Sequence, residues 1–193
     1  MNIAEFYDKI SSKYEELITS PQVNAQLTSN LKNVFSKYKI FNGTILDVGC
    51  GPGNLKSVLG NEFIYTGIDI SNEMLLKAKE KGYETIYGKI EELLSKIPSK
   101  SFDYIVSLSA LLFVKDINSV FIEFDRISKK GWIATLADIT PNYSKYFPID
   151  EPIYNHSKID LSGFKEDFYL PPWVSLTTGD KIRERMIFKR FFS

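Results

Sequence analysis

A glycine-rich turn follows directly on an apolar run in this chain. Residues 45–48 read Ile-Leu-Asp-Val, and residues 49–53 read Gly-Cys-Gly-Pro-Gly. Glycine lets a ligand approach the backbone where a Cβ atom would collide, so a strand ending in such a turn is typical of a nucleotide-like site in an α/β sheet. A second apolar run ends at Asp69, where a carboxylate can accept hydrogen bonds from both hydroxyls of a ribose. Together these features predict a site for an adenosine-type cofactor.

The residues of the turn favour a ligand that is cationic near the first glycine. A pyrophosphate-binding turn has the pattern G-x-G-x-x-G, which would require glycine where this chain has Asn54. Asp47 stands two residues before Gly49, where its charge would repel a diphosphate and attract an ammonium group. S-adenosylmethionine, with its sulfonium, its amino-acid end and its adenosine, suits these preferences better than NAD.

Strand and helix patterns alternate around these residues. Helix-length segments separate five β-rich runs, at 44–48, 63–69, 84–87, 102–108 and 131–136. Such alternation predicts a parallel sheet. Amphipathic helical patterns precede it at 3–18 and 23–38, and the alternating residues 183–191 suit an antiparallel edge strand. We expect an α/β fold: a three-layer, doubly wound sheet, mostly parallel with an antiparallel C-terminal strand, plus N-terminal helices.

Composition limits the compartment and the partners. The 24 basic residues balance the 24 acidic ones, so no global field attracts nucleic acid or anionic lipid. Cys50 is the only cysteine, which excludes an intramolecular disulfide and fits a reducing interior. The longest nearly uninterrupted apolar run, 104–114, falls short of the about 20 residues that cross a bilayer. We expect a cytoplasmic protein without a metal, and the oligomeric state stays open.

Residues 40–138 resemble the class I S-adenosylmethionine-dependent methyltransferases, and are most similar in pattern to the small-molecule "type 11" branch. Four motifs carry the resemblance, at 45–53, 67–71 with 74–75, 88–93 and 102–107. The first two motifs are specific and the other two are permissive. The resemblance implies a Rossmann-like fold and S-adenosyl-L-methionine as the cofactor.

Carried over residue by residue, the resemblance implies a set of cofactor-binding positions. They are Asp47, Gly49, Cys50, Gly51, Gly53, Asp69, Ile70, Met74, Ile90 and Ser107. The glycine turn would offer its backbone to the methionine end of the cofactor, with Asp47 near the amine and Ser107 closing that end. Asp69 would hold the ribose diol. Three apolar residues would surround the adenine: Ile70, Met74 and Ile90.

Lys89 departs from the family pattern. The family commonly has an acid after Gly88 that accepts a hydrogen bond from the adenine amino group, whereas lysine can donate but cannot accept. We therefore expect the Lys89 side chain to face solvent and the adenine to be bound by backbone atoms alone.

The resemblance divides one domain, residues 1–193, into three parts. Residues 1–40 would form a helical lid segment, 41–138 the cofactor-binding core, and 139–193 a substrate-side insert with the terminal strands. Three residues are candidates for the lid and the substrate side: Tyr7, Tyr14 and Phe113. An ordinary buried helical stripe explains Tyr7 equally well.

No catalytic residue is identified, although three side chains are candidates for a base: His156, Tyr143 and Asp138. The sequence predicts methyl transfer from S-adenosylmethionine to an oxygen, nitrogen or carbon atom of a small aromatic or apolar acceptor. Two other classes stay open, an NAD(P)-dependent oxidoreductase and a catalytically silent cofactor-binding scaffold subunit. Within the methyltransferases, a protein or RNA acceptor is a narrower alternative.

Overall fold

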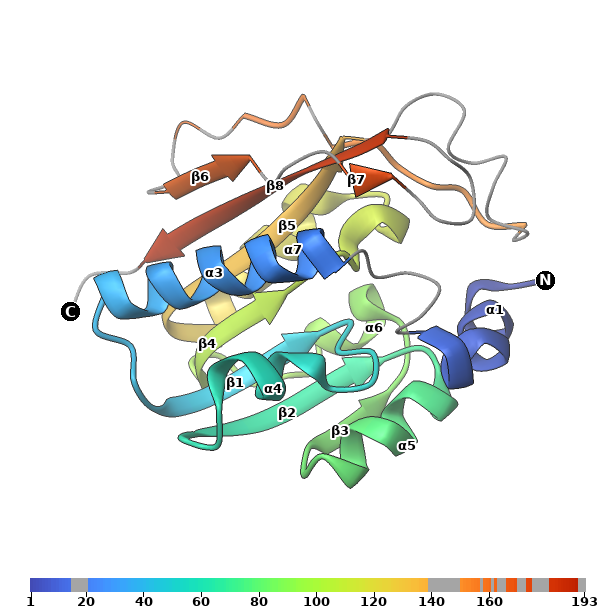
Figure 1. The fold of residues 1–193 in the computed structure, drawn as a ribbon, viewed down its shortest axis with the longest axis horizontal. Coiled ribbons are helices and arrows are strands. Elements are labelled where there is room, and N and C mark those ends of the chain that lie inside the picture. Colours follow the sequence, from blue (N-terminus) through green and yellow to red (C-terminus); the bar gives the residue numbers. More distant parts are fainter. Residues whose placement is uncertain are drawn as a thin grey trace.

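The central sheet has the strand order β3-β2-β1-β4-β5-β8-β6, and β7 pairs with β8 (Figure 1). The structure is a computed structural model that describes residues 1–14, 21–138, 150–156, 158–160, 162, 166–169, 173–174 and 181–190. Parallel pairing joins the first five strands: β1 (Gly43–Val48), β2 (Phe63–Asp69), β3 (Glu84–Tyr87), β4 (Phe102–Ser107) and β5 (Ser128–Asp138). The remaining three strands are β6 (Glu166–Tyr169), β7 (Trp173–Val174) and β8 (Lys181–Arg190), and β8 runs antiparallel to β5.

Helices cover both faces of the sheet. One face carries α3 (Pro21–Lys37), α4 (Asn54–Leu59) and α5 (Asn72–Glu80), which lie in front of the strands in Figure 1. The other face carries α6 (Ile90–Leu94) and α7 (Ile117–Ile127). This arrangement confirms the predicted three-layer, doubly wound α/β fold.

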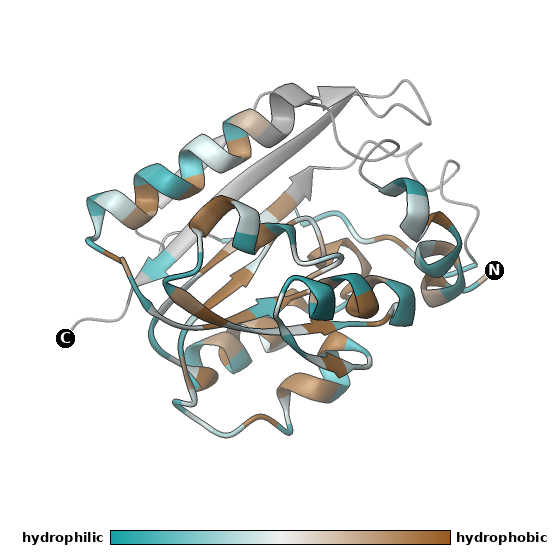
Figure 2. Cartoon of the chain, turned by 60° about the horizontal axis from the view of Figure 1, so that its bottom comes forward, coloured by the Kyte–Doolittle hydropathy of each residue, from teal (hydrophilic) through white to brown (hydrophobic). Residues whose placement is uncertain are grey.

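Successive side chains of a strand point to opposite faces of the sheet, so the apolar residues of the strands are divided between two cores. Ile45 packs under the first helix layer and Leu46 under the second, and neither side chain is exposed to solvent. In Figure 2 the brown, apolar residues lie along the strands and on the helix faces that meet them. Burial on both faces explains why these strands read as nearly continuous apolar runs.

The second core centres on Trp132 of β5. Its ring stacks on Phe121 at 4.6 Å and meets Phe124 edge-on at 5.5 Å, both from α7. The indole Nε1–H donates a hydrogen bond to Asp125 Oδ1 at 2.7 Å, which satisfies the polar atom of an otherwise buried ring. These contacts fix α7 against β5.

The strand order reverses at β1, which lies between β2 and β4. In doubly wound sheets, ligands bind in the crevice beyond the carboxyl ends of the strands at such a reversal. The helix α1 (Ile3–Ile10) and the 3₁₀ helix η1 (Ser11–Lys13) lie at this edge beside α5 (Figure 1), and the 3₁₀ helix η2 (Leu111–Phe113) follows β4. The sequence predicts one helix over 3–18, whereas α1 ends at Ile10 and is followed by η1; residues 15–20 lie outside the described part.

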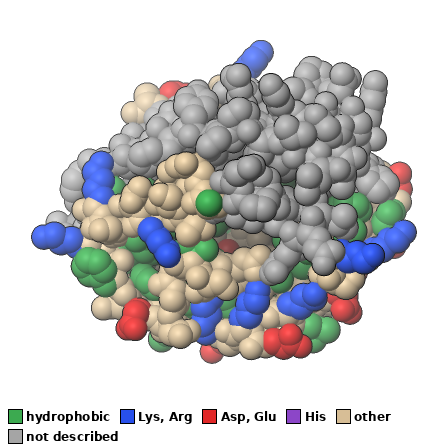
Figure 3. All heavy atoms as spheres, in the orientation of Figure 1, with side chains coloured by type: hydrophobic (Ala, Val, Ile, Leu, Met, Phe, Trp, Pro, Cys, Tyr) green, Lys and Arg blue, Asp and Glu red, His purple; other side chains and the backbone are tan. Residues whose placement is uncertain are grey.

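The face of Figure 3 carries Lys and Arg side chains interspersed with Asp and Glu. Among the described residues, no helix combines the length and the apolar character that a membrane crossing requires. Residues 139–149, which begin the predicted substrate-side segment 139–193 and include Tyr143, lie outside the described residues.

Candidate functional site

The glycine turn at the end of β1 is tied to β2. The backbone N–H groups of Gly49 and Cys50 both donate to the carbonyl oxygen of Ile68, at 2.8 and 3.1 Å. Gly49 has φ +71°, and a Cβ built on it would lie 2.1 Å from Ala110 Cβ. Gly49 is thus required for the close packing of two loops.

Gly51 is different, because the missing side chain leaves open space. Its φ is +51°, and a built Cβ would meet no atom within 4 Å. Gly51 lines a pocket at the carboxyl edge of the sheet. A ligand in that pocket can therefore reach the backbone at Gly51.

Asp69, the last residue of β2, joins the turn to the next loop. Its Oδ2 accepts from the Gly51 N–H and its Oδ1 from the Ser71 N–H, both at 2.9 Å. An ionised carboxylate has about four acceptor sites, so both oxygens retain capacity for ligand hydroxyl groups. Burial raises the pKa of Asp69, and hydrogen bonds from backbone N–H groups oppose the shift. The carboxylate also lines the pocket.

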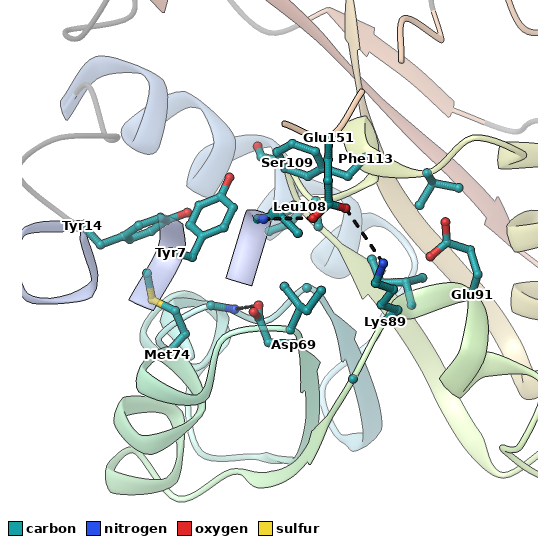
Figure 4. Close-up of a pocket in the computed structure, with 18 residues that line it drawn as sticks. Tyr7, Tyr14, Asp69, Met74, Lys89, Glu91, Leu108, Ser109, Phe113 and Glu151 are labelled. Atoms are coloured by element: carbon teal, nitrogen blue, oxygen red, sulfur yellow. Dashed lines mark hydrogen bonds and ion pairs between the residues drawn. The ribbon is translucent and has the colours of Figure 1, made fainter. Parts of the chain in front are cut away.

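The pocket brings together six of the predicted cofactor-binding residues: Gly49, Gly51, Asp69, Ile70, Met74 and Ile90. The three candidates for the lid and the substrate side also line it: Tyr7, Tyr14 and Phe113. In Figure 4, Asp69 and Met74 lie on one side of the pocket and Ser109 and Phe113 on the opposite side. The pocket thus has a side formed by the ends of β2 and α5 and a side formed by the loop after β4.

Aromatic rings from α1 and its neighbours form one wall. The Tyr7 ring contacts Phe113 edge-on with centroids 6.2 Å apart, and it lies 6.2 Å from the Tyr14 ring. Ile3 of α1 is buried and lines the same pocket. The wall can therefore contact a planar or apolar molecule over a large area.

The charged side chains of the lining are mostly acidic. Among the described lining residues, Asp69, Glu91 and Glu151 carry carboxyl groups and Lys89 is the basic residue. Glu151 Oε2 lies 3.9 Å from Lys89 Nζ, and Glu151 Oε1 accepts from the Ile3 N–H at 3.0 Å. Such a lining favours a cationic ligand over a diphosphate. The Lys89 side chain is 55% exposed and lies at the edge of the pocket (Figure 4).

Four predicted cofactor-binding residues lie outside the pocket lining. The Cys50 side chain is buried, Gly53 is the N-cap residue of α4, and the Ser107 hydroxyl donates to the Val48 carbonyl at 2.9 Å. Asp47 is 3% exposed and accepts a hydrogen bond from the Tyr83 hydroxyl at 3.0 Å. The structure thus places these four in the support of the turn, and their contacts with a cofactor stay predictions.

The electrostatics of Asp47 are unusual. Burial raises its pKa to about 7, against the opposing effect of the Tyr83 hydrogen bond. Near neutral pH the carboxyl group is therefore partly protonated. The sequence predicts that the charge of Asp47 attracts an ammonium group. That charge therefore depends on pH in the physiological range.

Of the three candidate bases, His156 and Asp138 are not among the described residues that line the pocket, and Tyr143 lies outside the described residues. His156 is buried, and its Nε2 lies 3.2 Å from the carbonyl oxygen of Leu111 in η2. Burial lowers the pKa of His156. Asp138 is the last residue of β5, where it pairs with Arg183 in the strand register. No His, Cys, Asp or Glu cluster able to hold a metal ion occurs in the described ranges.

Two functional candidates were not predicted from the sequence. Glu151 reaches the pocket from a segment 148 residues away from its partner Ile3, so no local pattern indicates it. Glu91 lies within the third motif, in the first turn of α6, and its position in that motif was the available signal.

Comparison with known proteins supplies the family. Residues 46–135 match the family model described as a methyltransferase domain. An uncharacterised protein of Methanocaldococcus jannaschii is 30% identical over 141 residues, which cover 72% of this chain and 53% of that protein. A phosphatidylethanolamine N-methyltransferase of Cereibacter sphaeroides is 32% identical over 95 residues, which cover 46% of this chain and 47% of that protein. The chain thus spans about half the length of these two relatives.

The fold is also found in solved structures. The magnesium protoporphyrin IX methyltransferase of Synechocystis PCC 6803, solved with bound SAH, is 14% identical and superposes with a TM-score of 0.66. The match covers 97% of each chain. At this identity the similarity shows a shared fold.

Proposed function

Because the chain belongs to the class I, Rossmann-like family of S-adenosylmethionine-dependent methyltransferases, we propose that its pocket binds S-adenosylmethionine and that the chain transfers the methyl group to a small acceptor. One observation carries this proposal. Gly51 opens its backbone to the same pocket that Asp69 lines, and each Asp69 oxygen accepts one backbone N–H and keeps capacity for a further donor. That combination suits an adenosyl group better than a phosphate.

The residues present fit the cofactor. The Asp69 oxygens would accept from the ribose hydroxyls, and the apolar side chains of Ile70, Met74 and Ile90 would contact the adenine. When bound, the donor supplies a methyl group already activated on a sulfonium. The protein therefore has to orient the acceptor and exclude water, which the wall formed by α1 and Phe113 favours.

The acceptor is proposed to be a small aromatic or apolar molecule. The aromatic wall of Tyr7, Tyr14 and Phe113 supports this class, because stacked and edge-on contacts suit planar rings. The relative from Cereibacter is named for phosphatidylethanolamine, and the short overlap with it does not identify the acceptor of this chain.

A transfer assay tests the function. Purified protein is incubated with donor labelled in the methyl group and with a panel of small aromatic and apolar acceptors, and separately with protein and RNA from a cell extract. We expect label in a small molecule. Label confined to macromolecules would show the acceptor proposal to be wrong, and donor binding without transfer to any acceptor would favour the scaffold.

Asp69→Ala tests the site itself. Loss of hydrogen bonds to a charged carboxylate should weaken S-adenosylhomocysteine binding about tenfold to a hundredfold. Because Asp69 also holds the Gly51 N–H, thermal unfolding of the variant is measured in parallel. An unchanged dissociation constant would refute the ribose assignment.

A further inference from the structure

The helix α1 is attached to α5 through Asp8. The Ser71 hydroxyl donates to Asp8 Oδ1 at 2.6 Å, and the Glu73 N–H donates to the same oxygen at 3.1 Å. One turn further along α5, Lys77 Nζ donates to the Ser11 carbonyl at 2.8 Å. Asp8 thus brings a carboxylate from one helix to the N-terminus of another, where the helix dipole favours negative charge.

Ser71 connects Asp8 to Asp69. It is the N-cap of α5, it is completely buried, and its Oγ accepts from the Met74 N–H at 3.2 Å. Its own N–H donates to Asp69 Oδ1. One buried residue therefore contacts the carboxylate on α1 through its side chain and the carboxylate of the pocket through its backbone.

The connection continues into the glycine turn. The second oxygen of Asp69 accepts from the Gly51 N–H, so displacement of Ser71 would change both the direction of the carboxylate and its contact with the turn. The same helix that carries Asp8 lines the pocket through Ile3 and Tyr7. Placement of α1 and orientation of Asp69 are thus linked by hydrogen bonds.

We propose that Asp8 is a positioning residue for the cofactor: through Ser71 it fixes the Asp69 carboxylate in the orientation that accepts the ribose hydroxyls. This inference rests on the proposed function. Asp8 is not among the described residues that line the pocket, so it would act on the cofactor through Ser71 and Asp69. Its effect on binding therefore depends on the hydroxyl groups of the ribose.

A role limited to attaching α1 has a different consequence. If Asp8 only held α1 in place, its loss would weaken the binding of every adenosyl ligand by the same factor. If it acts through Asp69, its loss reduces the preference for a ribose over a deoxyribose. The ratio of two dissociation constants separates the two roles.

The probes are S-adenosylhomocysteine and its 2′-deoxyribose analogue, titrated calorimetrically. In the unmodified protein we expect the deoxy analogue to bind about tenfold more weakly, since a charge-assisted hydrogen bond is lost. Asp8→Ala should reduce that ratio to about threefold or less. Asp8→Asn should retain it, because the amide oxygen can accept from the same two donors.

Lys77→Met is the matched control, because it removes a different hydrogen bond of α5, the one to the Ser11 carbonyl, without touching Ser71. It should leave the ratio unchanged. Ser71→Ala removes the same hydrogen bond, between Ser71 and Asp8, by deleting its donor, so it should lower the ratio as Asp8→Ala does. The double variant should show no further fall in the ratio. Ser71→Ala also serves if Asp8→Ala does not fold.

Each outcome is decisive. A ratio that Asp8→Ala or Ser71→Ala leaves unchanged overturns the inference, even if both absolute affinities fall. A wild-type ratio near one overturns it as well, because Asp69 then does not contact the hydroxyl groups. Absence of binding to either probe by folded wild-type protein contradicts the proposed function instead, and is recognised before any variant is compared.

Discussion

Gly49 and Gly51 share a left-handed backbone but differ in their surroundings. A side chain at Gly49 would collide with Ala110, whereas a side chain at Gly51 would project into open space at the pocket. The glycine pattern in the sequence indicates both positions equally. Only the packing of the loop after β4 separates the structural glycine from the one that faces the ligand.

Gly51→Val should abolish cofactor binding, because the branched side chain enters the pocket. The positive φ adds strain of about 1–2 kcal/mol to the folded state. Gly60→Val is the control: Gly60 has φ +90° and open space at its Cβ, but it lies at the end of α4, outside the described pocket lining. The two variants are compared by calorimetric titration and thermal unfolding. Retained affinity in Gly51→Val would show that no ligand approaches this turn.

The raised pKa of Asp47 predicts that the stability of the protein depends on pH. The pKa is about 7 in the folded state against an ordinary 3.8, so the folded protein binds more protons than the unfolded chain between these values. The contribution of Asp47 to the free energy of unfolding is therefore fully present below pH 4 and is lost as the pH rises through 7. Between pH 5 and pH 8 the loss is about 3 kcal/mol.

Asp47→Asn removes this titration and keeps an acceptor for the Tyr83 hydroxyl. From pH 5 to pH 8, urea denaturation should show its stability rising relative to wild type by about 3 kcal/mol. Asp103 is the control: burial would raise the pKa of its carboxyl group, but hydrogen bonds from Thr44 and Lys130 outweigh that effect and lower the pKa. Asp103→Asn should thus show no relative change over this range. Parallel curves for Asp47→Asn and wild type would contradict the shifted pKa.

The elements could be predicted because their signals are local. An apolar run, a turn and an amphipathic segment each specify their own conformation, and alternation of strand and helix implies a parallel sheet. The contacts of α1 could not be predicted in this way. Asp8 meets Ser71 across 63 residues and Glu151 meets Ile3 across 148, and such pairs depend on how complete elements pack.

The helix α7 stabilises the sheet on the face away from α3. Phe124 is completely buried against Trp132, so Phe124→Ala should lower the free energy of unfolding by about 3–5 kcal/mol. Ile122 lies on the same helix and is 65% exposed, so Ile122→Ala should cost about 0.5 kcal/mol or less. Urea denaturation measures both variants. Equal costs would contradict the packing of α7.

At the scale of the whole molecule the net charge is zero, but acidic and basic side chains are unequally represented at the pocket. The 24 basic and 24 acidic residues cancel over the chain, yet the described pocket lining has three carboxyl groups and one lysine. Composition therefore could not indicate the sign of the charge at the pocket, whereas the position of Asp47 before the glycine turn already predicted a cationic ligand. The acceptor could not be predicted in detail, because Glu151 and the wall of α1 come together only in the fold.

The central claim is that one adenosyl cofactor binds over Gly51 and Asp69. Its most direct test is calorimetric titration of the folded wild-type protein with S-adenosylhomocysteine, S-adenosylmethionine and NADH. The account predicts that both adenosyl sulfur compounds bind one molecule per chain and raise the melting temperature, and that NADH does neither. Binding of NADH without binding of either sulfur compound, or no heat and no thermal shift with any of the three, would contradict it.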